Sequence, residues 1–231
     1  MDYDKVKAEV FEIIRTKSKL KRDVFELSKL RFKELKFNLN QFITELAAEV
    51  HSFDSRLEIS YRDLGEYYAQ ITIAGDTLMF ALHTNVFLFP DSSHHWNTSY
   101  LKNEVGRGYC GTIQVYNFLA DSVRFNRHQD TGYLIARLFL NSDNHFFVEG
   151  KKELSLIFND FMHDEFTEDR MQDFITAVTR HSINFDLFVP NYQTIAELSW
   201  GEANQLKDNI SLRTGKRLGF QFGTDDESFE A

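Results

Sequence analysis

Hydrophobic side chains recur at alternating steps of four and three residues along the first part of the chain, where the first glycine is Gly65 and the first proline is Pro90. This period is typical of an amphipathic helix, and it also fits a two-stranded coiled coil. It predicts a helix over residues 4–36. The predicted seam begins at Val6 and carries the contacts that we expect with a partner: Val10, Ile13, Lys17, Leu20, Val24, Leu27 and Arg31.

The positions beside this seam leave two interpretations open. None of the flanking pairs expected in a parallel dimer joins opposite charges, and Phe11, Ile14 and Phe25 widen the apolar stripe. A broad stripe is typical of a helix that packs on its own domain, so we favour packing within the chain or in a bundle over a dimeric coiled coil. Asn38 with Gln41 resembles a capping box, which predicts a break near Asn38 and a second helix after it.

From Leu57 onward the hydrophobic period changes to two residues, which is typical of strands bounded by short turns. The predicted strands cover residues 57–61, 67–74, 77–82, 85–89, 111–118, 133–140 and 146–149. Short turns such as Gly75–Asp76 favour antiparallel pairing of neighbouring strands. The polar stretch 91–108 predicts a long loop.

After Gly150 the helical period returns. Thr167 is the predicted cap of one helix, Ser199 with Glu202 predicts another, and alternation around Phe220 predicts a last short strand. Helices followed by strands and then by helices imply an α+β fold. We expect a central antiparallel sheet arranged as a meander, with a long N-terminal helical arm and a C-terminal helical layer.

We divide the chain into a helical arm over residues 1–52, an α+β core domain over 53–222 and an acidic, disordered tail over 223–231. The formal net charge is −9, but residues 1–36 hold eleven Lys or Arg and seven Asp or Glu, a net charge of +4. The basic helix could contact phosphate, an acidic partner, or acidic helices of its own chain or of a neighbour. Nucleic acid is the less favoured partner, because the rest of the chain is acidic and would repel it.

Membrane binding is not expected, because Lys17 and Arg31 interrupt the apolar seam. The chain has no apolar run of 18 residues and no signal-peptide pattern at its start. Its composition, with 42% hydrophobic and 26% charged residues, is that of an ordinary globular protein. We therefore expect a soluble, cytoplasmic protein.

The densest set of reactive side chains lies in and beside the polar stretch: Cys110 with His94, His95 and Arg107. A cysteine nucleophile needs a nearby base and a positive environment, which the histidines and the arginine could supply. However, a lone cysteine at the start of a strand is more often a small buried hydrophobe. These four residues are therefore only weak catalytic candidates, and an enzyme is the less favoured interpretation.

Neither a metal nor a cofactor is expected. His94 and His95 would point to opposite sides of an extended segment and could not share one ion. The segment from Gly106 to Gly111 matches the spacing G-x-G-x-x-G, but it leads into a predicted strand, whereas a dinucleotide site must open a helix. The match is therefore not a nucleotide-binding signal.

Aromatic side chains along the sheet could line a ligand pocket or belong to the core: Tyr61, Tyr67, Tyr68, Tyr100, Tyr109, Tyr116, Phe118 and Phe125. At strand spacing they are more often core residues. The strands 67–74 and 111–118 carry apolar residues on both faces, so something must cover the second face, for example a partner subunit.

These patterns favour a non-enzymatic interaction, scaffold or regulatory subunit that self-associates, or binds a protein partner, through the N-terminal helix. The first alternative is a domain that senses a small ligand in an aromatic pocket of the sheet. The second alternative is a hydrolase that uses Cys110 and its neighbouring histidines.

Overall fold

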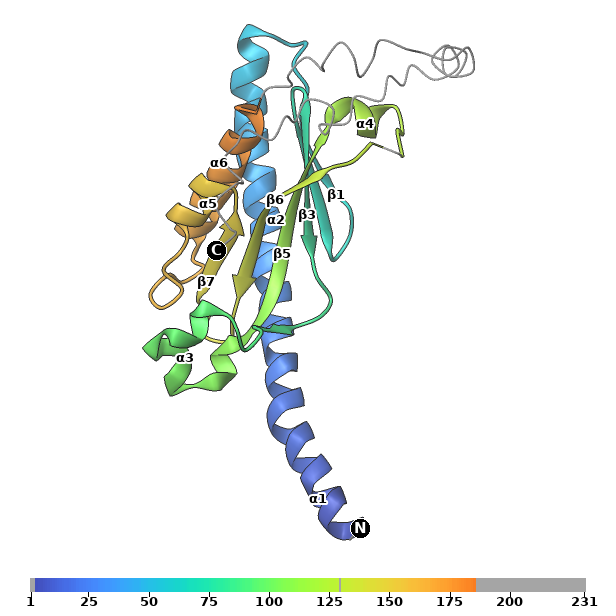
Figure 1. The fold of residues 1–231 in the computed structure, drawn as a ribbon. Helices are drawn as coiled ribbons and strands as arrows, with labels where there is room; N and C mark the ends of the chain where they lie inside the picture. The colour runs from blue at the N-terminus through green and yellow to red at the C-terminus, as the bar shows by residue number, and fades with distance from the viewer. Residues whose placement is uncertain (1–2, 129, 186–231) are drawn as a thin grey trace, which may run out of the picture.

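The structure, a computed structural model, describes residues 3–128 and 130–185, and its elements follow the predicted order of helix, sheet and helix (Figure 1). The helices are α1 (Tyr3–Ile13), the π-helical turn η1 (Ile14–Ser18), α2 (Lys19–Phe53), the 3₁₀ turn η2 (His94–Asn97), α3 (Ser99–Asn103), the 3₁₀ turn η3 (Val105–Gly108), α4 (Ala120–Arg124), α5 (Lys152–Ile157) and α6 (Glu168–Ile183). The strands are β1 (Ile59–Asp63), β2 (Tyr68–Ile73), β3 (Asp76–Leu82), β4 (Phe87–Leu88), β5 (Tyr109–Leu119), β6 (Tyr133–Leu140) and β7 (Phe146–Gly150).

The strands form a seven-stranded sheet in the order β1-β2-β3-β5-β6-β7, with the short β4 paired to β5. Every pairing is antiparallel, and apart from β4, which pairs with β5 and not with β3, strands that follow one another along the chain are neighbours in the sheet. Central registers place Phe80 opposite Val115, and Ile113 opposite Leu138. The predicted α+β fold with an antiparallel meander and a helical arm is therefore confirmed.

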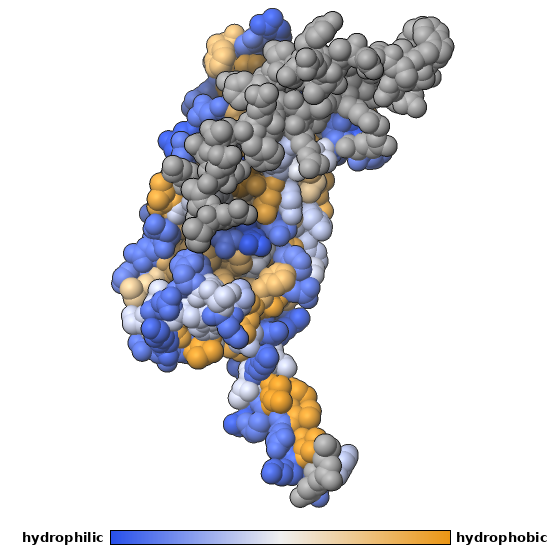
Figure 2. All heavy atoms as spheres, in the orientation of Figure 1, coloured by the Kyte–Doolittle hydropathy of each residue, from blue (hydrophilic) through white to orange (hydrophobic). Residues whose placement is uncertain are grey.

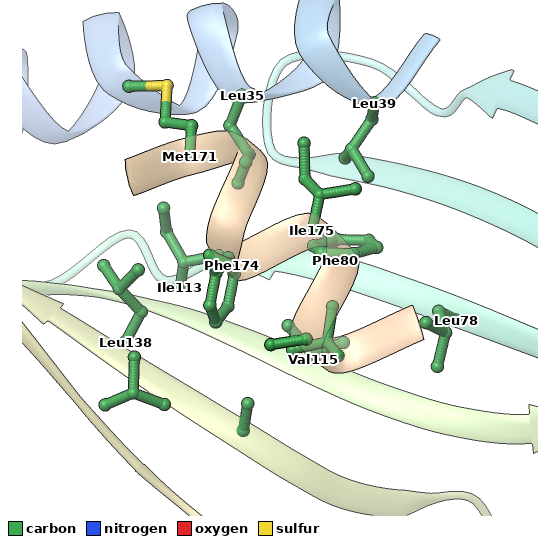
Figure 3. Close-up of a cluster of buried hydrophobic side chains, with 14 of the residues drawn as sticks. Leu35, Leu39, Leu78, Phe80, Ile113, Val115, Leu138, Met171, Phe174 and Ile175 are labelled. Atoms are coloured by element: carbon green, nitrogen blue, oxygen red, sulfur yellow. The ribbon is translucent and has the colours of Figure 1, made fainter. Parts of the chain in front are cut away.

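One face of the sheet is covered by α2 and α6, which share a single core with it (Figure 3). Phe32 and Leu35 of α2 and Phe174 and Ile175 of α6 are fully buried. They meet alternate strand residues such as Val115, because side chains at every second position point to the same face of a sheet. As predicted, Thr167 caps α6: its side chain accepts a hydrogen bond from the Arg170 amide.

The predicted break near Asn38 is wrong, because α2 runs without interruption from Lys19 to Phe53. The Asn38 side chain is buried, and its amide donates to Met171 Sδ at 3.6 Å. Its carbonyl oxygen accepts a hydrogen bond from Gln172 at 3.3 Å. Since α6 satisfies this amide, Asn38 does not compete for the backbone of its own helix.

The predicted long loop over residues 91–108 instead folds into the three short helices η2, α3 and η3. With β4 and the start of β5 it encloses a second buried cluster: Phe89, Tyr100, Leu101, Cys110, Phe139, Phe147 and Phe161, with Trp96 packed against them. Phe139 and Phe147 alternate with residues of the main core, so they lie on the opposite face of the sheet. At this end, the chain itself covers the second face that we expected a partner to cover.

Several predictions fall outside the described residues. These are the helix after Ser199, the strand around Phe220 and the tail over 223–231. The segment from Gly106 to Gly111 passes from η3 into β5, so no helix follows it, as the sequence indicated.

Candidate functional site

The first part of the N-terminal helix projects beyond the sheet (Figure 1). From here on, the arm means Tyr3–Lys19, which is shorter than the helical arm over residues 1–52 that the sequence predicts. Neither α1 nor η1 contains a buried residue, and every residue of the arm except the partly buried Val6 is exposed. At 1.5 Å per residue the arm is about 25 Å long. Within the part of the chain that the structure describes, the arm is therefore a helix with almost all of its side chains exposed.

Large apolar side chains gather along one side of this arm, beside polar residues (Figure 2). Phe11 is 62% exposed, Ile13 and Ile14 are each 56% exposed, and Val10 is 49% exposed. Tyr3, seven residues before Val10, is also largely exposed. Single exposed apolar residues are ordinary, but a contiguous patch on a projecting helix is typical of an interaction site.

The arm joins α2 through a π-helical turn at Ile14–Ser18. Within this turn the Thr16 hydroxyl donates to the Glu12 carbonyl at 2.7 Å. Such turns insert extra backbone into an α-helix and are often found at functional sites. The turn therefore offsets the helical phase of the arm from that of α2 at the point where the helix reaches the body.

The predicted seam divides into two parts at this junction. Val10, Ile13 and Lys17 are exposed on the arm, and Leu20 is the first seam residue after Val6 to become partly buried. The exposed part is available to a partner.

The remaining seam residues serve the fold of their own chain. Val24 is fully buried, and Leu27 packs against the main core. Arg31 donates to Asn144 Oδ1 and to Glu34, each at 2.7 Å. These three residues join α2 to the body.

Two basic residues of α2 pair with the end of β1 and the turn after it, whereas the other ion pairs of α2 lie within the helix itself. Lys29 lies 2.5 Å from the Glu66 carboxylate. Lys36 donates to both carboxylate oxygens of Asp63 and to the Gly65 carbonyl, each at 2.9 Å. The carboxylates that meet these two lysines thus belong to the sheet.

Of the predicted catalytic candidates, Cys110 belongs to the second buried cluster. Cys110 is fully buried, and burial raises the pKa of its thiol. Its sulfur lies 4.0 Å from the Arg107 carbonyl oxygen. This environment favours the neutral thiol, whereas nucleophilic attack needs the thiolate.

The expectation that His94 and His95 point to opposite sides is wrong. The two residues lie on the 3₁₀ turn η2 rather than on an extended segment, and their ring centroids are 4.1 Å apart. The His95 ring also packs against Phe147 at 4.4 Å and Phe89 at 5.0 Å. Burial and the neighbouring His94 lower the pKa of His95. His95 therefore acts as an aromatic member of the cluster.

Arg107 holds the helical segment 91–108 against the turn between β6 and β7. Its Nε donates to Asp143 at 2.7 Å, its guanidinium lies over the Tyr100 ring at 4.4 Å, and it donates to the Tyr100 carbonyl. The Tyr100 hydroxyl donates to Asp143 and accepts from Asn141. Burial raises the pKa of Tyr100 to about 12, so this network keeps a neutral phenol.

The aromatic residues that could have formed a ligand pocket are dispersed. Tyr100 belongs to the second cluster, Tyr61 and Tyr67 pack against the main core, and Tyr68 and Phe125 are exposed. Among residues 3–128 and 130–185, no group of three or more His, Cys, Asp or Glu side chains could hold a metal ion.

A groove of about 600 Å³ lies on the helical side, where α2 passes the start of α6. It is lined by Leu30, Arg31, Lys33, Glu34, Phe37, Asn38, Glu168 and Met171. Sequence reasoning missed Phe37 here, although it lies seven residues after Leu30 and hence on the same face of the helix. None of the eight aromatic residues singled out in the sequence lines this groove.

Within the described part of the chain, no helix is both long enough and apolar enough to cross a membrane. Comparisons of the chain with protein-family models, with curated proteins and with solved structures found no match. The arm is thus the feature of the described residues that most resembles a functional site.

Proposed function

We propose that this chain is a non-enzymatic interaction subunit that forms homo-oligomers through its N-terminal arm. The observation that carries the proposal is the exposed apolar patch on a helix that projects from the body, with Phe11 62% and Ile13 56% exposed. A partner that covered such a side chain would stabilise the complex by about 1–2 kcal/mol for each one.

The conformation of the arm supports the same proposal. Short helices without tertiary contacts are marginal in water, because most helical stability in proteins comes from packing an apolar face. In the described structure, neither α1 nor η1 has a buried side chain. A second helix laid along Val10 and Ile13 would provide such packing, as in a coiled coil.

The surroundings of the other candidate residues favour structural roles. Cys110 and His95 are packed among aromatic rings, and Arg107 is engaged by Asp143 and Tyr100. These contacts support structural roles for Cys110, His95 and Arg107, while His94 is exposed and its ring lies against that of His95. Among the aromatic residues singled out in the sequence, Tyr61 and Tyr67 pack against the main core and Tyr100 belongs to the second cluster, which favours packing over a ligand pocket.

The test is sedimentation velocity of the full chain over a range of concentrations. We expect the wild-type chain to associate, and Ile13→Glu to raise the dissociation constant at least tenfold, because it buries a charge in the contact. Ala8→Glu is the matched control: Ala8 is exposed on the same helix but points away from the apolar side, and this variant should associate like the wild type.

A wild-type chain that remains monomeric at every concentration would refute self-association. Equal weakening by both variants would indicate general repulsion rather than a contact at Ile13. Retention on heparin that is lost with salt, without self-association, would favour nucleic acid as the partner of the basic helix.

A further inference from the structure

We infer that the arm of one copy docks into the groove between α2 and α6 of a second copy. The inference rests on the proposed function, and it adds the surface that receives the arm. This groove is the one lined by Leu30 and Phe37 of α2 and by Met171 of α6, among others. The contact therefore joins two different surfaces, an arm and a groove, rather than two arms.

The groove carries apolar surface that stays exposed in the described part of the chain. Phe37 is 68% exposed and Leu30 is 51% exposed, although both belong to a helix whose other side is packed on the sheet. The buried Met171 lies beside them. An amphipathic helix that lays its apolar side into such a groove is a recurrent mode of recognition.

The spacing of apolar residues on the arm matches that of the groove. Leu30 and Phe37 are seven residues apart on α2, which is about 10 Å along a helix. Val6 and Ile13 have the same separation on the arm, and Val10 lies between them on the same side. The apolar side of the arm can therefore cover both exposed residues of the groove at once.

Two charged side chains of the groove are available to a partner. Lys33 belongs to α2 and Glu168 to α6, and within residues 3–128 and 130–185 neither side chain takes part in an ion pair or a hydrogen bond. Arg31 and Glu34, by contrast, already pair with each other. The groove thus offers one basic and one acidic group, on different helices.

The arm carries the matching pair of charges. Lys7 and Glu9 likewise form no ion pair among the described residues. At about 100° per residue they lie on opposite flanks of the apolar side that contains Val10. In one of its two possible directions, the arm therefore places Glu9 beside Lys33 and Lys7 beside Glu168. Such complementary charges favour one orientation of the docked helix.

A chain cannot fill its own groove with its own arm. The arm and α2 form one continuous helix, and Leu30 follows Lys19, the last residue of the arm, by eleven residues, or about 16 Å. Folding the arm back onto the groove would require this helix to break. The occupant is therefore the arm of a second copy, whether two copies exchange arms or each arm passes to the next copy.

Sedimentation velocity of the full chain tests the groove. Phe37→Glu should raise the dissociation constant at least tenfold, because it buries a charge in the contact. Thr44→Glu is the matched control: Thr44 is exposed seven residues further along α2 and does not line the groove, so this variant should associate like the wild type. Both substituted residues are exposed, so thermal unfolding should show an unchanged fold.

Mixing two variants gives a sharper readout. Ile13→Glu has an impaired arm and an intact groove, and Phe37→Glu has the reverse. Neither should associate alone, but the mixture should form complexes that contain both chains, because one intact arm meets one intact groove. If arms bound each other instead, Phe37→Glu would associate by itself and Ile13→Glu would join no complex, which would overturn the inference.

An exchange of charges tests the orientation. Glu9→Lys or Lys33→Glu alone should raise the dissociation constant about threefold, because each opposes like charges at a solvent-exposed pair. Both substitutions in one chain should restore the wild-type value. A double variant that associates more weakly than either single variant would overturn the placement of Glu9 beside Lys33.

The outcomes separate the inference from the proposed function. A wild-type chain that is monomeric at every concentration refutes the proposed function itself. A wild-type chain that associates, together with a Phe37→Glu variant that associates equally well, leaves self-association through the arm intact. That result overturns docking in the groove and assigns the groove to another occupant.

Discussion

The exposed arm and the docked part of α2 belong to one helix and carry apolar residues at the same spacing, yet their environments are opposite. In the docked part, Val24, Phe32 and Leu35 are completely buried against the sheet. In the arm, Phe11 and Ile13 are more than half exposed. The difference lies in what faces the helix: the sheet ends where the arm begins.

This contrast teaches that a hydrophobic period predicts a helix and its apolar side but not what covers that side. The sheet supplies the cover for α2 through side chains such as Phe80 and Val115. On the N-terminal side of Leu20, the described residues provide no such cover. Each prediction below compares a substitution at a packed position with one at a position that is exposed or has open space around it.

The largest effect is expected from truncating a docked aromatic side chain. Phe32→Ala should lower the free energy of unfolding by about 3–5 kcal/mol, because it leaves a cavity between α2 and the sheet. Phe11→Ala, on the arm, should change it by no more than about 0.5 kcal/mol. Urea denaturation at a protein concentration below the dissociation constant measures both, and similar losses would show that the arm is not free.

A smaller effect is expected where α2 comes closest to the sheet. A Cβ at Gly111 would lie 2.0 Å from Ser28 Oγ and 2.8 Å from Ser28 Cβ, so Gly111→Ala should destabilise the fold by about 1–3 kcal/mol. Ser28→Ala in the same chain should recover part of this loss, since it removes the nearer atom. Gly75→Ala is the matched control, because a Cβ there meets nothing within 4 Å. Thermal unfolding of these three variants, beside the wild type, tests the order.

The smallest effect is expected from ion pairs. The hydrogen bond from Lys36 lowers the pKa of Asp63, so this pair stabilises the fold above pH 3.8 and the contribution is lost as the pH falls through the lowered pKa. Lys36→Gln should cost at most about 1 kcal/mol at neutral pH, since Asp63 is largely exposed to solvent. The cost should vanish in strong acid.

The arm provides the comparison for this pair. Among the described residues, Lys19 pairs with Asp23, one turn along the same helix. Lys19→Gln should therefore leave the global free energy of unfolding unchanged within about 0.5 kcal/mol. A loss with Lys19→Gln as large as with Lys36→Gln, or a cost of Lys36→Gln that persists in acid, would contradict this assignment of the two pairs.

Much of the fold could be predicted because local patterns and global structure agree. The strand over residues 133–140 was predicted with the bounds that β6 has, and Thr167 was predicted as the cap of α6. In both places the backbone preference of the segment and the burial of its apolar side point to the same element. Such agreement allows a sequence to be interpreted without knowing the rest of the molecule.

The remaining features depend on contacts between distant parts of the chain. Asn38 resembles a cap in sequence, but α6 brings Met171 and Gln172 to its amide. Cys110 and His95 resemble reactive residues, but aromatic side chains from β7 and neighbouring segments surround them. The spacing of the seam likewise predicted which side of the helix is apolar. Which seam residues pack on their own chain depends on where the sheet ends, and the local sequence does not indicate that position.

The unbroken helix also has a mechanical consequence. Tyr3 and Phe32 belong to one continuous helix, which acts as a lever: the packing of α2 on the sheet holds one end, and the arm is the end that moves. For a lever of about 25 Å, a tilt of about 10° at the sheet moves the tip by about 4 Å. Any force applied at Tyr3 is thus transmitted to the sheet as a torque, and the turn at Ile14–Ser18 is the point at which the lever can yield.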